Sequence, residues 1–244
     1  EIEIAIIKLP RISNFSDLDP LFNQSSIQLR WVEPNHELGN PDLLIIPGSK
    51  QTIKDLESLN KNGLSNQIKN YAINGGSIFG ICGGLQMLGI TLEDPYNSES
   101  NPRGKSFSFK GMEILPIKTT FGERKHTLQR RETVLWPKKA RINGFEMHYG
   151  ESELINKNNL EINTLFNENS LGWIIDKKDK SFIGGTYLHG IFENDQWRIN
   201  MINKIRVRKG LKKLKLNNNF KERERLLDLL TDFFEENINI NEII

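Results

Sequence analysis

The residue with the clearest chemical potential is Cys82, the only cysteine of the chain. It follows the apolar run Ile78–Ile81 and precedes the pattern of an amphipathic helix, with glycines at Gly80, Gly83 and Gly84. A sharp strand-to-helix turn needs such small residues, because the chain crowds itself and the nucleophile adopts a strained backbone conformation. Unpaired N–H groups and the positive dipole at the helix start favour a thiolate. The sequence predicts a nucleophile elbow with sulfur at its tip.

A lone cysteine more often serves as a small buried apolar residue. Such a structural cysteine has no need for glycines two residues before it and at the two positions after it, whereas a nucleophile on a turn does. We therefore expect Cys82 to be catalytic.

A thiol nucleophile needs a base, and histidine titrates in the right range. His36 and His126 lie in polar, loop-like stretches and are expected at the surface. His189 follows the apolar run Phe182–Leu188, at the carboxyl end of a predicted strand, where the active sites of open α/β sheets lie. His148 is similarly placed but is equally suited to orienting a loop. Position alone favours His189 only slightly as the catalytic base.

Acyl transfer at a thiol also requires N–H donors for the tetrahedral oxyanion. The N–H of Gly83, directly after the nucleophile, is one candidate. The turn Pro47–Lys50, which follows the apolar run Leu43–Ile46, is the other. Taken alone this turn is a plain strand-to-helix connection capped by Ser49 or Thr52. Next to a nucleophile elbow, it becomes a candidate oxyanion site.

These residues must be positioned by a sheet, and the pattern of the chain predicts one. Short apolar runs alternate with polar or helical stretches, which is typical of βαβ units. We expect an α/β fold with an open, mostly parallel sheet sandwiched by helices. The first predicted strands are Ile4–Ile7, Ile27–Val32, Leu43–Ile46 and Ile78–Ile81, and the clearest helix is Leu64–Ile73. The later predicted strands, after an irregular excursion over Glu93–Lys110, are Gly111–Ile117, Arg141–His148, Leu171–Ile175 and Phe182–Leu188.

The predicted domain organisation is one enzyme domain over residues 1–200 and a helical extension over residues 201–244. In the extension, Leu and Phe residues between Leu226 and Phe234 recur at helical spacing among charged residues. We expect this helix to pack on the same domain. The chain opens on Glu1 and goes at once into a buried strand pattern, which indicates a piece of a longer protein.

Composition narrows the class of partner. The formal charge is only +2, so nothing favours nucleic acid or a membrane surface, and a small-molecule substrate is expected. One cysteine cannot form an internal disulfide, and no apolar run reaches the length of a membrane span, so we expect a cytoplasmic protein. Neither a phosphate-binding loop nor a Cys/His cluster at zinc spacing is present, and no metal is expected.

Three motifs together resemble a known family. The elbow Gly80–Gln86, the turn Pro47–Lys50 and the late His189 are similar to the class I glutamine amidotransferases, which have a flavodoxin-like fold. Two further stretches, Leu9–Pro20 and Gly185–Asp195, together with the residues around His148, narrow the resemblance to the amidotransferase domain of corrinoid amide synthases. Leu9–Pro20 favours the type that acts on adenosylcobyrinic acid a,c-diamide over cobyrinic acid a,c-diamide synthase.

The resemblance implies a division of labour. Cys82 attacks the side-chain amide of glutamine and His189 transfers protons, while Gly83 N–H and the turn at Gly48 bind the oxyanion and Gln86 lies near the substrate. The released ammonia passes to an N-terminal synthetase domain, absent from this chain, which uses ATP and Mg²⁺ to activate corrinoid carboxylates. No cofactor is expected in the present domain.

One position departs from the family pattern. Many class I amidotransferases carry a glutamate two residues after the histidine, and here that position is Ile191. We therefore expect a Cys–His dyad, with His189 oriented by a backbone carbonyl and no role assigned to Glu193. Two alternatives remain at this point. In the first, the chain is the glutaminase part of a related ligase, such as cobyrinic acid a,c-diamide synthase or a muropeptide amidotransferase. In the second, it is a non-catalytic interaction subunit.

Overall fold

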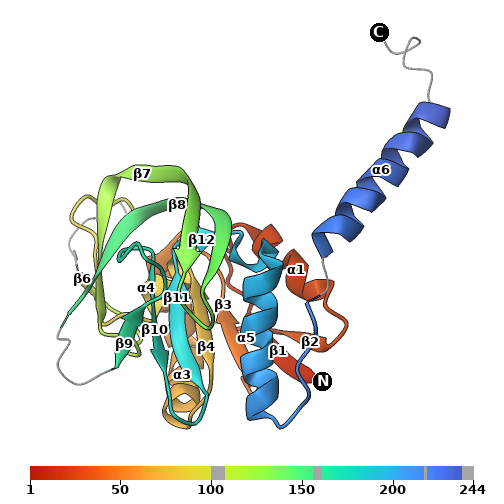
Figure 1. The fold of residues 1–244 in the computed structure, drawn as a ribbon. Helices are drawn as coiled ribbons and strands as arrows, with labels where there is room; N and C mark the ends of the chain where they lie inside the picture. Colours follow the sequence, from red (N-terminus) through yellow and green to blue (C-terminus); the bar gives the residue numbers. More distant parts are fainter. Residues whose placement is uncertain (100–107, 156–160, 217–218, 238–244) are drawn as a thin grey trace.

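A seven-stranded sheet forms the centre of the molecule in the computed structural model, which describes residues 1–99, 108–155, 161–216 and 219–237 (Figure 1). The order is β2-β1-β3-β4-β11-β10-β9; the first five strands run parallel, and β10 pairs antiparallel with both β11 and β9. This confirms the predicted open, mostly parallel α/β sheet. The strands are β1 (Ile2–Ile7), β2 (Ile27–Val32), β3 (Leu43–Ile46), β4 (Ile78–Ile81), β9 (Ile162–Thr164), β10 (Gly172–Asp176) and β11 (Phe182–Thr186).

The helices that flank this sheet differ greatly in length. Three are longer: α2 (Thr52–Lys61), α3 (Leu64–Ile73) and α5 (Asp195–Arg208). The short ones are η1 (Phe15–Leu18), α1 (Asp19–Phe22), α4 (Gly83–Met87) and η3 (Ile191–Glu193). Among the described residues, no helix has the length and apolar character needed to cross a membrane.

A second sheet, which the sequence analysis did not predict, packs beside the first. Its order is β12-β8-β7-β5-β6, and it is dominated by the antiparallel pair of β7 (Ile117–Val134) and β8 (Ala140–Leu154). The smaller strands are β5 (Thr91–Glu93), β6 (Ser108–Lys110) and β12 (Leu188–His189). β7 escaped prediction because its middle, residues 123–129, is exposed and polar except for Leu128, so no apolar alternation marks it.

Several predicted strand boundaries are wrong, and the strand predicted over Arg141–His148 extends over Ala140–Leu154. The stretch Gly111–Ile117 is mostly loop, and the strand begins only at its last residue. The predicted strand Phe182–Leu188 is divided at Tyr187 between two sheets, with β11 in the first and β12 in the second. This division brings His189 to the junction of the two sheets.

The C-terminal part differs from the predicted organisation. Helix α5 continues across the proposed boundary at residues 200 and 201, and Met201, Ile202 and Ile205 are buried, so the domain does not end there. The helix α6 (Asn219–Asn237) forms as predicted. The prediction that this helix packs on the domain is wrong for the described side chains, because α6 projects away from both sheets (Figure 1). The exposed apolar side chains of α6 are Leu227, Leu229, Leu230, Phe233 and Phe234.

Removal of α6 is therefore predicted to leave the stability of the domain almost unchanged. Deleting residues 217–244 is expected to shift the unfolding midpoint by little, since its described apolar side chains lose no buried contact. Deleting residues 201–244 is the matched control. It also removes Met201, Ile202 and Ile205, each worth about 1.5–3 kcal/mol when buried, and should unfold the protein. Thermal denaturation followed by circular dichroism compares the two, and equal losses of stability would contradict the assignment.

Candidate active site

The turn at Cys82 has the geometry of a nucleophile elbow. Cys82 has φ 50° and ψ −108°, a strained backbone conformation for a residue with a side chain. Its N–H donates to the carbonyl of Thr186 at 2.7 Å, which ties the strained residue to the neighbouring strand β11. Helix α4 begins at the next residue, so the sulfur lies at a helix start as predicted.

Glycines are required where this elbow meets the turn after β3. A Cβ added to Gly84 would lie 2.0 Å from the carbonyl oxygen of Ile46, so only glycine allows the elbow and β3 to approach so closely. A Cβ on Gly48 would lie 2.6 Å from Ser13 Oγ and 3.3 Å from His189 Cε1. The structure thus brings the turn at Gly48 next to the imidazole of His189.

His189 keeps one ring nitrogen without a hydrogen bond among the described residues, whereas the thiol of Cys82 lies 3.8 Å from the carbonyl oxygen of Met147. The imidazole is buried, and its Nδ1 is taken by a hydrogen bond to a carboxylate. Its Nε2 has no hydrogen-bond partner within the part of the chain that the structure describes, and the thiol of Cys82 is among the groups that shift the pKa of the ring. The two residues predicted to carry the chemistry are therefore brought together.

The carboxylate on His189 belongs to Asp17, which the sequence analysis did not identify. Asp17 Oδ2 lies 2.7 Å from His189 Nδ1, and its Oδ1 accepts the N–H of Gly190 at 2.8 Å. The predicted dyad oriented by a backbone carbonyl is therefore wrong. The orienting group is a side chain 172 residues away in sequence, supplied by η1 rather than by the segment that contains Glu193.

The surroundings of His189 hold it as a cation. Burial lowers the pKa of the imidazole, but the hydrogen bond to Asp17 and the interaction with Cys82 outweigh burial and raise the pKa from 6.5 to about 10. His189 is thus protonated at neutral pH, which suits it to donate a proton to a leaving group. The raised pKa also stabilises the folded state below pH 6.5, and this contribution is lost as the pH rises through about 10.

His148, the alternative base, has both ring nitrogens occupied. Nδ1 lies 2.7 Å from the carbonyl oxygen of Gly150, and Nε2 lies 3.0 Å from Glu146 Oε2. Burial disfavours the ionised form of Glu146, yet hydrogen bonds from His148 and Arg130 keep the pKa of that carboxyl below its ordinary value. The structure therefore favours His189 as the base. His36 and His126 are exposed, as predicted.

Cys82 opens into a cavity of about 110 Å³ beneath the second sheet. Gln86 lines it and is held by Thr52 Oγ1 at 3.1 Å and by the hydroxyl of Tyr187 at 3.2 Å. Gly48 and Gly83 adjoin it through their neighbours Ser49 and Cys82. The remaining lining residues are Ser13, Asn14, Lys50, Glu99, Phe121, Lys125, Met147, His148 and Tyr149.

The sequence analysis did not identify Glu99, a charged residue of this cavity. It belongs to the stretch predicted as an irregular excursion, and its carboxylate accepts the N–H of Thr52 at the start of α2. Burial, followed by the nearby carboxylates of Asp94 and Asp55, raises the pKa of Glu99 to about 7 despite this hydrogen bond. A carboxylate so poorly solvated is well suited to a cationic ligand.

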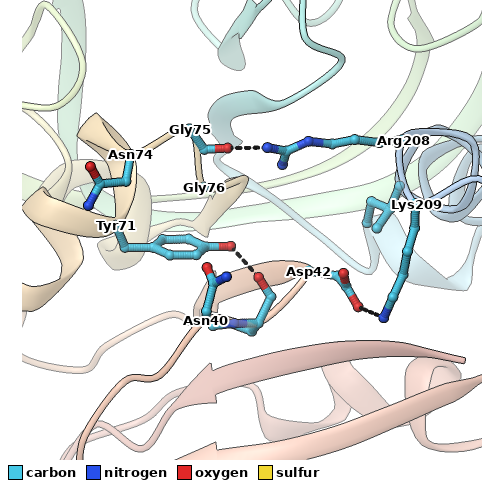
Figure 2. A pocket seen from close by; sticks show the side chains of 10 residues that line it. Asn40, Asp42, Tyr71, Asn74, Gly75, Gly76, Arg208 and Lys209 are labelled. Carbon is cyan, nitrogen blue, oxygen red and sulfur yellow. Dashed lines mark hydrogen bonds and ion pairs between the residues drawn. The ribbon is translucent and has the colours of Figure 1, made fainter.

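A larger cavity, of about 240 Å³, lies at the opposite end of the sheet (Figure 2). Its walls come from residues 40–42 before β3 and 74–76 before β4, so it opens at the amino ends of these strands. Its two cations already have partners. Arg208 donates to the carbonyl of Gly75 at 2.7 Å, and Lys209 donates to Asp42 at 2.7 Å. The chemistry therefore belongs to the smaller cavity, at the carboxyl ends of the strands.

A thiol on a strained elbow, with a buried histidine bonded to a carboxylate near it, is an arrangement suited to acyl transfer by a cysteine nucleophile. The comparisons agree with this class. Residues 3–197 match the family described as the CobB/CobQ-like glutamine amidotransferase domain, and the chain belongs to this family.

Two curated relatives of the chain have the same name. The chain is 71% identical to the cobyric acid synthase of Prochlorococcus marinus strain NATL1A and 49% identical to that of strain SARG. Both matches cover all of this chain. The chain spans about half the length of these curated relatives, 50% of the first and 49% of the second.

Solved structures support the fold. A crystal structure of a glutamine amidotransferase matches with a TM-score of 0.60 at 13% identity, covering 85% of this chain and 99% of that one. A glutamine amidotransferase from Thermotoga maritima matches with a TM-score of 0.52 at 14% identity and 94% coverage of both chains. The flavodoxin-like fold of the class I amidotransferases is thereby confirmed.

The role of Asp17 is tested by the reactivity of the single thiol. Asp17→Asn removes the charge that holds the His189 cation, and we expect alkylation of Cys82 by iodoacetamide at pH 7 to slow roughly tenfold or more. Mass spectrometry reports one adduct, because the chain has one cysteine. Asp19→Asn, an exposed acid two residues further on, is the matched control and should react like the wild type. Equal alkylation rates for both variants would show that Asp17 does not contribute to the reactivity of Cys82.

Proposed function

We propose that this chain hydrolyses glutamine at Cys82 and releases ammonia for amide synthesis. The observation that carries the proposal is the strained thiol of Cys82 on the wall of a cavity, with the buried pair of His189 and Asp17 close enough for the thiol to shift the pKa of the imidazole. Membership of the amidotransferase family supports the same reaction. The strained elbow argues against the alternative of a non-catalytic subunit, because strain of this kind persists where it serves a mechanism.

In the proposed reaction, the Cys82 thiolate attacks the side-chain amide carbon of glutamine. The N–H groups of Gly83 and the turn at Gly48 stabilise the negative charge that forms on the carbonyl oxygen. His189 donates its proton to the leaving nitrogen, and ammonia departs from a glutamyl thioester. Water then attacks the thioester, His189 accepts its proton, and glutamate leaves as the thiolate is restored.

We assign the recognition of the amino-acid end of glutamine to charged residues of the cavity. Glu99 offers a buried carboxylate for the α-ammonium group, and Lys50 and Lys125 supply positive charge for the α-carboxylate. Gln86, held by Thr52 and Tyr187, lies near the side-chain amide. Ion pairing in a poorly solvated cavity gives selectivity for a free amino acid.

The acceptor is proposed from the relatives. We propose that the ammonia is delivered to an ATP-dependent synthetase domain of the same enzyme, where carboxylates of adenosylcobyrinic acid a,c-diamide become amides. The name of the 71% identical relative, cobyric acid synthase, and the half-length match support this assignment. ATP and Mg²⁺ belong to that domain and not to the present one. A reducing, cytoplasmic location is proposed because the catalytic thiol must stay unoxidised.

The nucleophile is tested by a glutamine analogue that carries a diazo-ketone in place of the amide. We expect it to form one covalent adduct, located at Cys82 by peptide mass spectrometry, because the reactive carbon takes the position of the amide carbon. Cys82→Ser should form no adduct and release no ammonia from glutamine.

The variants His189→Ala and His148→Ala distinguish the two histidines when their rates of glutamine hydrolysis are compared. Loss of roughly 10²–10⁴-fold in rate is expected for His189→Ala. A larger loss for His148→Ala would reverse the assignment.

Glu99 is tested by the pH dependence of glutamine binding. Glu99→Gln keeps a hydrogen-bond acceptor for Thr52 but loses the charge, so KM for glutamine should rise roughly tenfold with a smaller change in kcat. In the wild type, KM should rise as the pH falls below about 7, where the carboxylate becomes protonated, and this rise should be absent from the variant. Glu93→Gln, which removes a surface ion pair with Lys118, is the control. An unchanged KM for Glu99→Gln would exclude the assignment.

A further inference from the structure

Two exposed phenylalanines pack against a partly buried tryptophan at the surface, and we name Phe15, Phe22 and Trp31 the aromatic patch. Phe15 is 51% exposed and Phe22 is 48% exposed. Both contact Trp31, with ring centroids 5.1 Å and 6.3 Å from it. Rings that stack on one another at a surface expose a continuous apolar area, unlike scattered apolar residues, and such areas mark interaction sites.

The elements beneath the aromatic patch are incompletely covered. Trp31 belongs to β2, the edge strand of the seven-stranded sheet, and Ile27 and Leu29 of the same strand are only partly buried. Only η1 and the four-residue helix α1 lie between β1 and β2 in the chain, where a full helix is usual in a βαβ unit. An edge strand with partly exposed apolar residues is a surface that a partner can cover.

The aromatic patch is also directly connected to the active site. Phe15 and Asp17 belong to the same 3-10 helix, η1, so one face of this short element is exposed and the other holds His189. The residues just before η1 are bonded to the turn at Gly48. Ser13 N–H donates to the carbonyl of Gly48 at 2.9 Å, and Lys50 N–H donates to the carbonyl of Arg11 at 2.8 Å.

We propose that the aromatic patch is the surface on which the synthetase half of the enzyme docks, so that the partner contacts the same short helix, η1, that supplies Asp17 to His189. This rests on the proposed function, because it takes the synthetase half as the partner. The chain spans about half the length of its curated relatives, and we take the other half as the partner of the aromatic patch. The patch adjoins the carboxyl end of β1, the end of the sheet at which ammonia is released. A paired Lys8 and Glu33 beside Trp31 provide the polar rim that interfaces have.

Hydroxyl-radical footprinting tests the contact without relying on any substrate. Oxidation of Phe15, Phe22 and Trp31 is compared between residues 1–244 and the longer protein, with Ile73, 79% exposed on α3, as a reference. We expect protection of the aromatic patch in the longer protein only. Equal oxidation in both would overturn the proposal. The proposal would also fail if the patch were protected within residues 1–244 and this protection were lost on deleting residues 217–244, because α6 would then cover the patch. Protection that depends on protein concentration would contradict it too, because a second copy of the chain would then cover the patch.

A double variant, Phe15→Ser with Phe22→Ser, tests the consequence for catalysis in the longer protein. Amidation driven by glutamine should fall about tenfold or more, the effect of losing aromatic anchors, while amidation driven by ammonium chloride should be unchanged. Leu128→Ser with Leu135→Ser, two other exposed apolar residues, is the matched control. Alkylation of Cys82 in residues 1–244 should be normal in both variants, which shows that the site itself is intact. Equal loss with glutamine and ammonium chloride would contradict docking, whereas absence of any amidation in the wild type would instead refute the proposed function.

Discussion

The hydrogen bond between Asp17 and His189 is the interaction on which the rest of the site depends. It joins residues 172 positions apart, and it is buried, so it forms only when the first and last parallel segments of the chain are both in place. It occupies Nδ1 of the imidazole and leaves Nε2 for Cys82. Without it, burial would favour a neutral imidazole, and the thiol would lose its cationic partner.

The sheet topology explains how this interaction is assembled. β1 leads into η1 and Asp17, β4 leads into Cys82, and β11 pairs with β4 and leads through β12 to His189. Because these strands run parallel, their carboxyl ends meet at one edge. The second sheet then closes the cavity over this edge with residues of β7 and β8, among them Lys125 and His148.

Much of the first sheet was predictable from the sequence, because its strands are short apolar runs. β2, β3, β4 and helix α3 have the predicted boundaries. Cys82 was evident for the same reason, since the glycines around it report a tight local turn. Long-range features were not evident. The polar strand β7 is stabilised by its partner β8 rather than by an apolar face, and no local pattern shows it.

Asp17 and Glu99 show why part of the site was not predicted from the sequence. Each acts across a large separation: Asp17 on His189, and Glu99 on Thr52, 47 residues away. A single acidic residue in a loop resembles any solvated surface carboxylate. The resemblance directed attention to a glutamate near the histidine, whereas the fold supplies the carboxylate from the opposite end of the domain. The motif Leu9–Pro20 contains Asp17, and it was the signal available.

The measurement that tests the central claim most directly is the titration of the His189 ring by nuclear magnetic resonance. The ring signals of isotope-labelled residues 1–244 are assigned by their loss in His189→Gln and followed from pH 5 to pH 11. The account predicts an imidazolium ring through pH 8 that loses its proton only near pH 10. A ring that titrates near 6.5, with Asp17 and Cys82 both intact, would contradict it.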